Sequence, residues 1–180
     1  MSNGNGITLE GDKMGTNNIA TRALIALKYV ISTQNDAAIT VARVMLGAVF
    51  FAHGAQKMLG WFGGYGFSGT MGFFTQQMGI PAVFAFLAIA AEFFGGLGLI
   101  VGLLGRVAAF GILSVMVVAI ATVHAQYGFF MNWAGNQKGE GIEYHLLVIA
   151  LAAAIIIKGS GALSFDWLLN RKLNAMTKNA

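Results

Sequence analysis

The sequence predicts an all-α integral membrane protein: a four-helix bundle with both termini cytoplasmic (N-in/C-in), preceded by an N-terminal interfacial amphipathic helix. Of its 180 residues, 57% are hydrophobic and only 10% are Asp, Glu, Lys or Arg, whereas soluble domains carry roughly a quarter charged residues. The apolar residues form four runs, and most basic residues fall on one side of the membrane that these runs would cross. These observations exclude an ordinary soluble domain and a disordered chain.

The first 36 residues are expected to lie outside the bilayer. Residues 1–18 form a polar stretch with neither the basic start nor the apolar run of a signal peptide. Residues 19–31 are apolar along one helical stripe, but they are fewer than the roughly 20 residues that cross a bilayer. We therefore expect a polar tail and then a helix lying on the membrane surface. Residues 32–36 supply a polar break and a helix N-cap.

Four apolar runs follow, at about 37–59, 81–104, 107–126 and 142–157, and the fourth is short. Pro81 suits the first turn of a helix, where its missing N–H costs little. The chain divides into an N-terminal region (1–36), a membrane domain (37–169) and a basic cytoplasmic tail (170–180).

Basic residues support this topology. With the N-terminus cytoplasmic, nine of the 11 Lys and Arg residues lie on the cytoplasmic side, which is the positive-inside pattern. Three crossings would place the basic tail outside, so the short fourth run is also predicted to span. Nucleic-acid binding is not expected, because the charges are spread between apolar runs. The cytoplasmic set is Lys13, Arg22, Lys28, Arg43, Arg106, Lys158, Arg171, Lys172 and Lys178, and the outer set is Lys57 and Lys138.

Glu92 is the deepest carboxyl, near the centre of the second run. A charged side chain there costs roughly 2.5–3.5 kcal/mol on insertion scales, so it needs a partner, water or a function. Arg43, His53 and Lys57 share roughly one face of the first helix. The alternating helix directions bring polar groups from the first, third and fourth runs to one outer level above Glu92. The candidate site residues are Glu92, Lys57, His53, Arg43, His124, Glu143 and His145.

This cluster permits several interpretations. Glu92 could relay protons beside Lys57, or the cluster could hydrogen-bond a quinone. A metal held by the three histidines is disfavoured, because no helix carries an HxxH or HxxxH pair, and no metal site is predicted. A structural ion pair between Lys57 and Glu92 or Glu143 would explain the same residues. Glu92 is too short and too deep to reach the interface, which favours a functional site there.

Glycines mark the second run at Gly95, Gly96, Gly98 and Gly102. Gly98 and Gly102 have the small-xxx-small spacing that lets two helices touch backbone to backbone. We interpret these four residues as helix-packing positions within the bundle.

Two aromatic segments, 61–72 and 127–141, lie at the outer level and are interpreted as interfacial segments over the polar cluster. Within the first, residues 64–69 match the GxGxxG spelling of a dinucleotide site. They follow a membrane helix rather than a strand, and no acidic residue lies about twenty positions further on, so no such site is predicted.

Three motifs resemble the DoxX family of small four-helix membrane proteins, which includes the DoxD-type subunit of archaeal thiosulfate:quinone oxidoreductase. They are ARVMLGAVFFAHGAQKMLGWF, AAEFFGGLGLIVGLLGR and GALSFDWLL, and the resemblance covers about 37–169. It implies a four-helix bundle in a bacterial plasma (inner) membrane, associated with redox systems, but it implies no defined reaction. The motif residues are Arg43, Gly47, His53, Gly54, Lys57, Gly60, Glu92, Gly95, Gly96, Gly102, Arg106, Ser164 and Asp166.

The leading functional hypothesis is a membrane subunit of a quinone-linked redox system, whose polar cluster contacts quinone, protons or a partner. The chain has no Cys and no cofactor motif, so we expect no covalently bound cofactor and no electron transfer by this chain alone. Whether it is an enzyme or a non-catalytic subunit stays open. The alternatives are a purely structural subunit of a larger complex and an oligomeric transporter of protons or a small solute. The predicted partners are the lipid bilayer and a protein partner or further copies of the chain.

Overall fold

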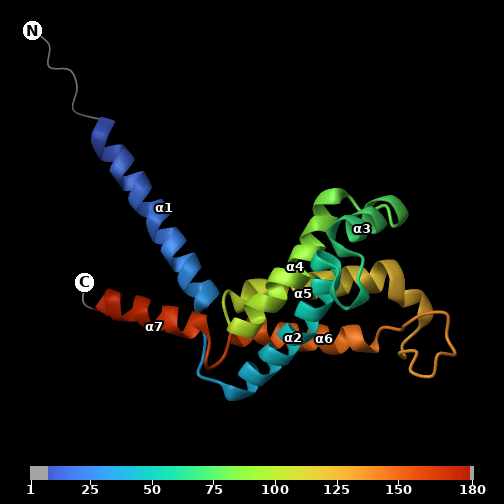
Figure 1. The fold of residues 1–180 in the computed structure, drawn as a ribbon. Helices are drawn as coiled ribbons and strands as arrows, with labels where there is room; N and C mark the ends of the chain where they lie inside the picture. The colour runs from blue at the N-terminus through green and yellow to red at the C-terminus, as the bar shows by residue number, and fades with distance from the viewer. Residues whose placement is uncertain (1–7, 179–180) are drawn as a thin grey trace, which may run out of the picture.

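The computed structural model describes residues 8–178, and within them all regular structure is helical (Figure 1). Three stretches are long and apolar enough to cross a membrane: α2 (Ala37–Leu59), α4 (Ala82–Val101) and the run Gly105–Tyr127, which begins with α5 (Gly105–Ala119). The fourth predicted run forms α6 (Glu143–Lys158), whose 16 residues are fewer than in these three. The predicted all-helical membrane character is confirmed.

Both ends of α2 follow from its sequence. The Asp36 carboxylate accepts hydrogen bonds from the amides of Ala38 (2.9 Å) and Ile39 (3.2 Å), which is the N-cap predicted within 32–36. Gly60 ends the helix in the left-handed conformation, with φ +74°, as glycine does most easily.

Two details of α4 differ from the prediction. Pro81 is the N-cap, with ψ 138°, and so precedes the first turn. The helix stops at Val101 because Gly102 adopts φ +71°, a left-handed conformation that ends helices. Gly102 is therefore a helix-ending residue, and a Cβ there would lie 2.4 Å from Ser164 Cβ, so this glycine packs against the turn before α7.

The backbones of α2 and α4 approach each other closely at other glycines. A Cβ on Gly96 would lie 2.4 Å from the amide nitrogen of Phe51, and one on Gly54 would lie 2.4 Å from the Cα atom of Phe93. A Cβ on Gly47 would lie 2.8 Å from the amide nitrogen of Ile100. Gly95 faces α5 at ordinary contact distance. Of the four predicted packing glycines, Gly96 makes the closest approach to the backbone of another helix.

One apolar core is shared by α2, α4, α5 and α6. Phe50 and Leu99 lie at its α2–α4 side, and Ile112 and Ile155 come from α5 and α6. The two helices that follow in sequence, α5 and α6, also pack against each other. Its buried members are Leu46, Phe50, Leu99, Ala109, Ile112, Met116, Val148, Ala152 and Ile155.

The outer segment after α2 is helical rather than an open loop. It forms η1 (Trp61–Gly63), α3 (Gly66–Gly72) and the π-helical turn η2 (Phe73–Gln77). α3 contacts both α2 and α4, and Trp61 and Tyr65 are exposed. The third membrane run also changes pitch, from α5 into the π-helical turn η3 (Ile120–His124) and then η4 (Ala125–Tyr127).

Two further helices, α1 (Thr8–Ile31) and α7 (Phe165–Lys178), leave the same end of the bundle and diverge (Figure 1). α1 begins earlier than the predicted interfacial helix, because a helix extends cheaply once it has nucleated, so residues 8–18 belong to it. Residues 170–178 of the predicted tail belong to α7. Residues 1–7 and 179–180, the remaining parts of the predicted tails, lie outside the described residues.

Candidate functional site

Lys57 and Glu92 form an ion pair between α2 and α4, with 2.5 Å between Lys57 Nζ and Glu92 Oε2. The tight contact at Gly54 sets up the pair, because it places the α4 backbone at Glu92–Phe93 directly against α2. The exposed side-chain fractions are 26% for Lys57 and 6% for Glu92. The lysine therefore reaches outward, while the carboxylate is enclosed by protein.

The position of this pair makes it costly. Lys57 lies in the last turn of α2, and Glu92 lies in the middle of α4. Withdrawing two charges from water costs more than their attraction returns unless further hydrogen bonds support them. Ionisable groups inside membrane segments are accordingly rare and mark functional sites by default.

A second pair lies at the outer ends of the third and fourth runs, where the His124 and His145 rings have centroids 4.1 Å apart. His124 Nδ1 lies 2.9 Å from the carbonyl oxygen of Glu140, which ties the histidine to the outer segment. His145 is buried, and its Nδ1 atom has no hydrogen-bond partner. His124 belongs to the π-helical turn η3, a geometry that occurs frequently at functional sites.

Tyr144 connects the two pairs and was missed by sequence reasoning. Its hydroxyl is buried without a hydrogen-bond partner, lies within electrostatic reach of Glu92, and its ring centroid is 5.6 Å from that of His145. A neutral residue gave no charge signal in the sequence. Tyr144 lies between the candidate residues Glu143 and His145 in the sequence, but which of these three side chains faces inward depends on the rotation of α6.

Glu143 and His53 lie apart from the ion pair. Glu143 Oε1 accepts a hydrogen bond from Trp133 Nε1 at 3.1 Å and so fastens the outer segment 127–141 to the start of α6. His53 is exposed, with its ring 6.4 Å from that of Phe50.

Arg43 belongs to a different cluster, at the opposite end of α2. It lies 14 residues before Lys57, about 21 Å along the helix at 1.5 Å per residue. Its guanidinium donates to the carbonyls of Ser160 (2.7 Å), Ile100 (2.8 Å) and Leu99. The predicted common site with Lys57 is corrected: seven-residue spacing aligned the faces of these residues but not their depths.

The cluster around Arg43 provides hydrogen-bond partners for backbone groups at the ends of helices. Arg43 bonds carbonyls in the last turn of α4, which have no partner within the helix. The buried Asp166 carboxylate accepts from the amides of Leu104 (2.9 Å) and Gly105 (3.0 Å) at the start of α5, and from Ser160 Oγ (2.5 Å). Arg106 bonds the carbonyls of Ile156 and Ile157 at the end of α6. These charges are structural caps.

The described residues 8–178 contain no group of three or more His, Cys, Asp or Glu side chains placed to hold a metal ion. The remaining cluster combines one buried carboxylate, one ammonium group, one phenol whose hydroxyl has no hydrogen-bond partner and two adjacent, mutually tilted imidazoles. Such a set can donate and accept hydrogen bonds inside the membrane and can exchange protons.

Comparisons with known proteins agree with the membrane character of the chain. The chain is 29% identical over 137 residues to "Inner membrane protein YqjF" of Escherichia coli (strain K12), an alignment that covers 76% of this chain and 95% of that protein. It is 28% identical over 124 residues to "Putative oxidoreductase CatD" of Bacillus subtilis (strain 168), covering 69% of this chain and 81% of that protein. No solved structure matches. The DoxX family model matches residues 38–125, which include nearly all of α2, α4 and α5 together with Lys57 and Glu92, and this part of the chain is therefore similar to the DoxX family.

Proposed function

We propose that this chain is a membrane subunit of a quinone-linked redox system, and that the Lys57–Glu92 pair with Tyr144 is the place where it contacts the quinone. The observation that carries this proposal is an enclosed carboxylate paired at 2.5 Å inside the membrane domain, within electrostatic reach of a buried hydroxyl that has no hydrogen-bond partner. A redox role is also supported by the name of the Bacillus subtilis relative.

The residues present fit a quinone. Its carbonyl oxygens accept hydrogen bonds, and Lys57 and Tyr144 are donors at this site, the second with an unused hydroxyl. A bound quinone couples electron transfer to proton uptake. Glu92 would hold the Lys57 ammonium group in place, and the His124–His145 pair lies between the site and the outer segment.

The proposed topology has four spans, with α6 as the fourth and both termini cytoplasmic. Its 16 residues cover about 24 Å at 1.5 Å per residue, short of the roughly 30 Å hydrocarbon core, but Glu143 and Lys158 at its ends can reach the interface. Support comes from the core that α6 shares with α2, α4 and α5 and from the distribution of basic residues. α1 would lie on the cytoplasmic surface of a bacterial inner membrane, where the name of the Escherichia coli relative places that protein.

A second candidate function is assembly of a larger complex. The observation in its favour is that α1 leaves the bundle (Figure 1) and exposes Ile19, Ile25 and Tyr29. A protein partner or further copies of the chain would cover these side chains. Mild-detergent purification tests this candidate: a stoichiometric partner is expected, and a monodisperse single chain would contradict it.

The quinone proposal is tested by replacing the pair with apolar residues, Lys57→Met with Glu92→Leu. Such a replacement of a buried ion pair is often neutral for stability, so the double variant should fold. Titration of nanodisc-embedded protein with decylubiquinone should show binding in the wild type and none in the variant. Glu140→Gln, in the exposed outer segment, is the matched control and should bind as the wild type does. Equal binding by the wild type and the double variant would reduce the pair to a structural role.

A further inference from the structure

A second candidate site lies at the opposite end of the bundle, where α4 ends and α7 begins. The turn between α6 and α7 places Leu163 in a left-handed conformation, with φ +49°, which few residues other than glycine adopt. Its carbonyl oxygen accepts from Arg43 Nη2 at 3.3 Å, while its side chain is 86% exposed. The cap on α4 therefore turns an apolar side chain away from the protein.

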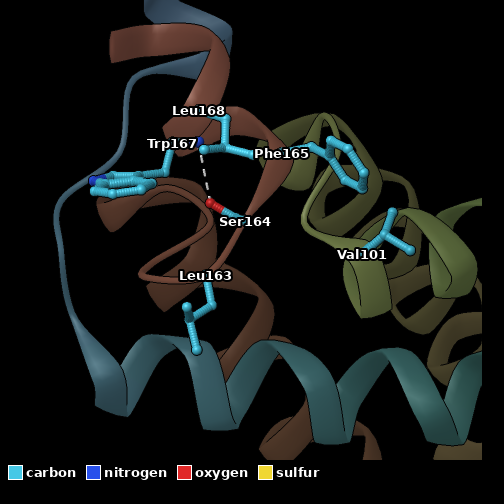
Figure 2. Close-up of a pocket in the computed structure, with 6 residues that line it drawn as sticks. All are labelled: Val101, Leu163, Ser164, Phe165, Trp167 and Leu168. Atoms are coloured by element: carbon cyan, nitrogen blue, oxygen red, sulfur yellow. Dashed lines mark hydrogen bonds between the residues drawn. The ribbon is translucent and has the colours of Figure 1, made fainter.

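Beside this turn is a pocket of about 280 Å³. Phe165 and Val101 lie on one side of it and Trp167 on the other (Figure 2). Its one hydroxyl is already bonded, because Ser164 Oγ donates to the Gly161 carbonyl at 2.9 Å and accepts from the Trp167 amide at 3.2 Å. The pocket suits a hydrocarbon ligand. Its lining is Val101, Leu163, Ser164, Phe165, Trp167 and Leu168.

Positive charge adjoins the apolar pocket. The Arg171 guanidinium lies over the Trp167 ring, 4.7 Å from its centroid, and Lys172 follows on the same helix; both residues are exposed. The nearby Asp166 carboxylate is buried and bonded to Leu104, Gly105 and Ser160, and it forms no ion pair with Arg171 or Lys172 in the described part of the chain. A ligand here would be apolar at one end and anionic at the other.

The surroundings indicate the bilayer as the source of that ligand. Val101 is the last residue of a membrane-competent helix, and exposed Leu97, Leu103 and Leu104 continue the apolar surface of α4 to the pocket. Acyl chains of the surrounding lipid therefore reach its edge. Basic residues at a membrane surface attract anionic lipids.

We propose that this pocket binds an acyl chain of an anionic phospholipid, whose phosphate group is held by Arg171 and Lys172. This site is independent of the Lys57–Glu92 site and does not rest on the proposed redox function. It would anchor α7 to the membrane surface and fix the end of α4.

Trp167 provides a direct reporter. Of the three tryptophans, Trp61 and Trp133 are replaced by phenylalanine, and the single-tryptophan full-length protein is titrated in detergent with brominated phosphatidylglycerol or brominated phosphatidylcholine. Bromine quenches tryptophan fluorescence on contact. Quenching by the anionic lipid should saturate at a concentration about thirtyfold lower than for the zwitterionic lipid, given two basic residues near the headgroup.

Variants of this single-tryptophan protein separate the contribution of the basic residues to lipid binding from that of the apolar pocket. Arg171→Gln with Lys172→Gln should remove the preference for the anionic lipid. Val101→Phe, which adds no tryptophan, should fill the pocket and weaken the quenching by both lipids. Lys138→Gln, a basic residue of the outer segment, should change nothing. Equal quenching by both lipids in the parent protein, or a preference that survives Arg171→Gln with Lys172→Gln, would overturn the proposal. A lack of quenching by either lipid would also overturn it and leave the face to a protein partner.

Discussion

Arg43 and Lys57 lie on the same helix but have partners of different kinds. Arg43 bonds several backbone carbonyls that the ends of α4 and α6 leave without partners. Lys57 bonds one side chain, Glu92, from the middle of a helix whose backbone is already satisfied. The first interaction is required by helix geometry. The second is not required by the fold, which is why we assign function to it.

Arg43→Leu should destabilise the protein. The change leaves the carbonyls of Ser160, Leu99 and Ile100 without their donor, and loss of buried hydrogen bonds to a charged group costs about 3 kcal/mol or more. The thermal unfolding temperature in mild detergent should fall. Arg43→Lys should recover only part of the loss, because an ammonium group lacks the planar fork of donors. An unfolding temperature for Arg43→Leu equal to that of the wild type would show that these bonds contribute little.

The sequence identified Glu92 and Lys57 as candidate residues from their expected depth in the membrane, and the structure pairs them. It could not separate Arg43 from them, because periodicity gives the face of a helix but not the partner at each depth. It also could not find Tyr144, because the direction in which its side chain points depends on the rotation of α6 as it packs against α5 and α2. Asp166 can cap α5 only because of the conformation of the turn 159–164, and hydrophobic periodicity does not predict the conformation of such a turn.

Contact between α2 and α4 depends on small residues at a few positions. Gly54 and Gly96 let the two backbones meet, and the contact at Gly54 places Glu92 opposite Lys57. Without the close approach, the ion pair would not form at this depth. The packing of these helices is therefore part of the site.

Gly96→Ala should be destabilising, whereas its neighbour provides the matched control. The added methyl group at 96 would lie 2.4 Å from the Phe51 amide nitrogen, so α2 and α4 must separate, at a cost of about 1–3 kcal/mol. In Gly95→Ala the methyl group would lie 3.6 Å from the Ala108 carbonyl oxygen, and stability should be unchanged or slightly higher. Thermal unfolding of the two variants side by side checks this. Equal unfolding temperatures would contradict the assigned contact.

Element boundaries were predictable where local chemistry sets them and less so elsewhere. α2 has the predicted bounds, because Asp36 and Gly60 cap it. α4 ends earlier, since Gly102 adopts a left-handed conformation, and it does so in close contact with Ser164 and Arg43, which are distant in sequence. The helical turns within 61–77 were not predicted, because their glycines signal a loop and only packing against α2 and α4 makes them helical.

Across the whole molecule, the two clusters of charge lie at opposite ends of the bundle. One end carries the caps, the exposed basic residues of α7 and both diverging helices. The other carries the ion pair, the adjacent His124 and His145 rings and the two aromatic segments. This polarity matches a protein with its basic end in the cytoplasm.

Cysteine labelling tests this orientation without a background correction, because the chain has no cysteine. With both termini cytoplasmic, Lys138→Cys should react with a membrane-impermeant maleimide added to spheroplasts, since the loop before α6 would face outward. Lys172→Cys should react only after the membrane is permeabilised. Reaction of both positions before permeabilisation would mean that α6 does not cross the membrane.

Glu92→Gln, expressed at the chromosomal level in the host, distinguishes a functional from a purely structural role of Glu92. The amide keeps the shape of the side chain but removes its charge and its capacity to exchange protons. Quinone-dependent oxygen consumption by isolated membranes should fall to the level of a deletion strain, while the amount of the protein in the membrane stays as in the wild type and Glu140→Gln has no effect. An unchanged rate at equal protein level would contradict the assignment of this site.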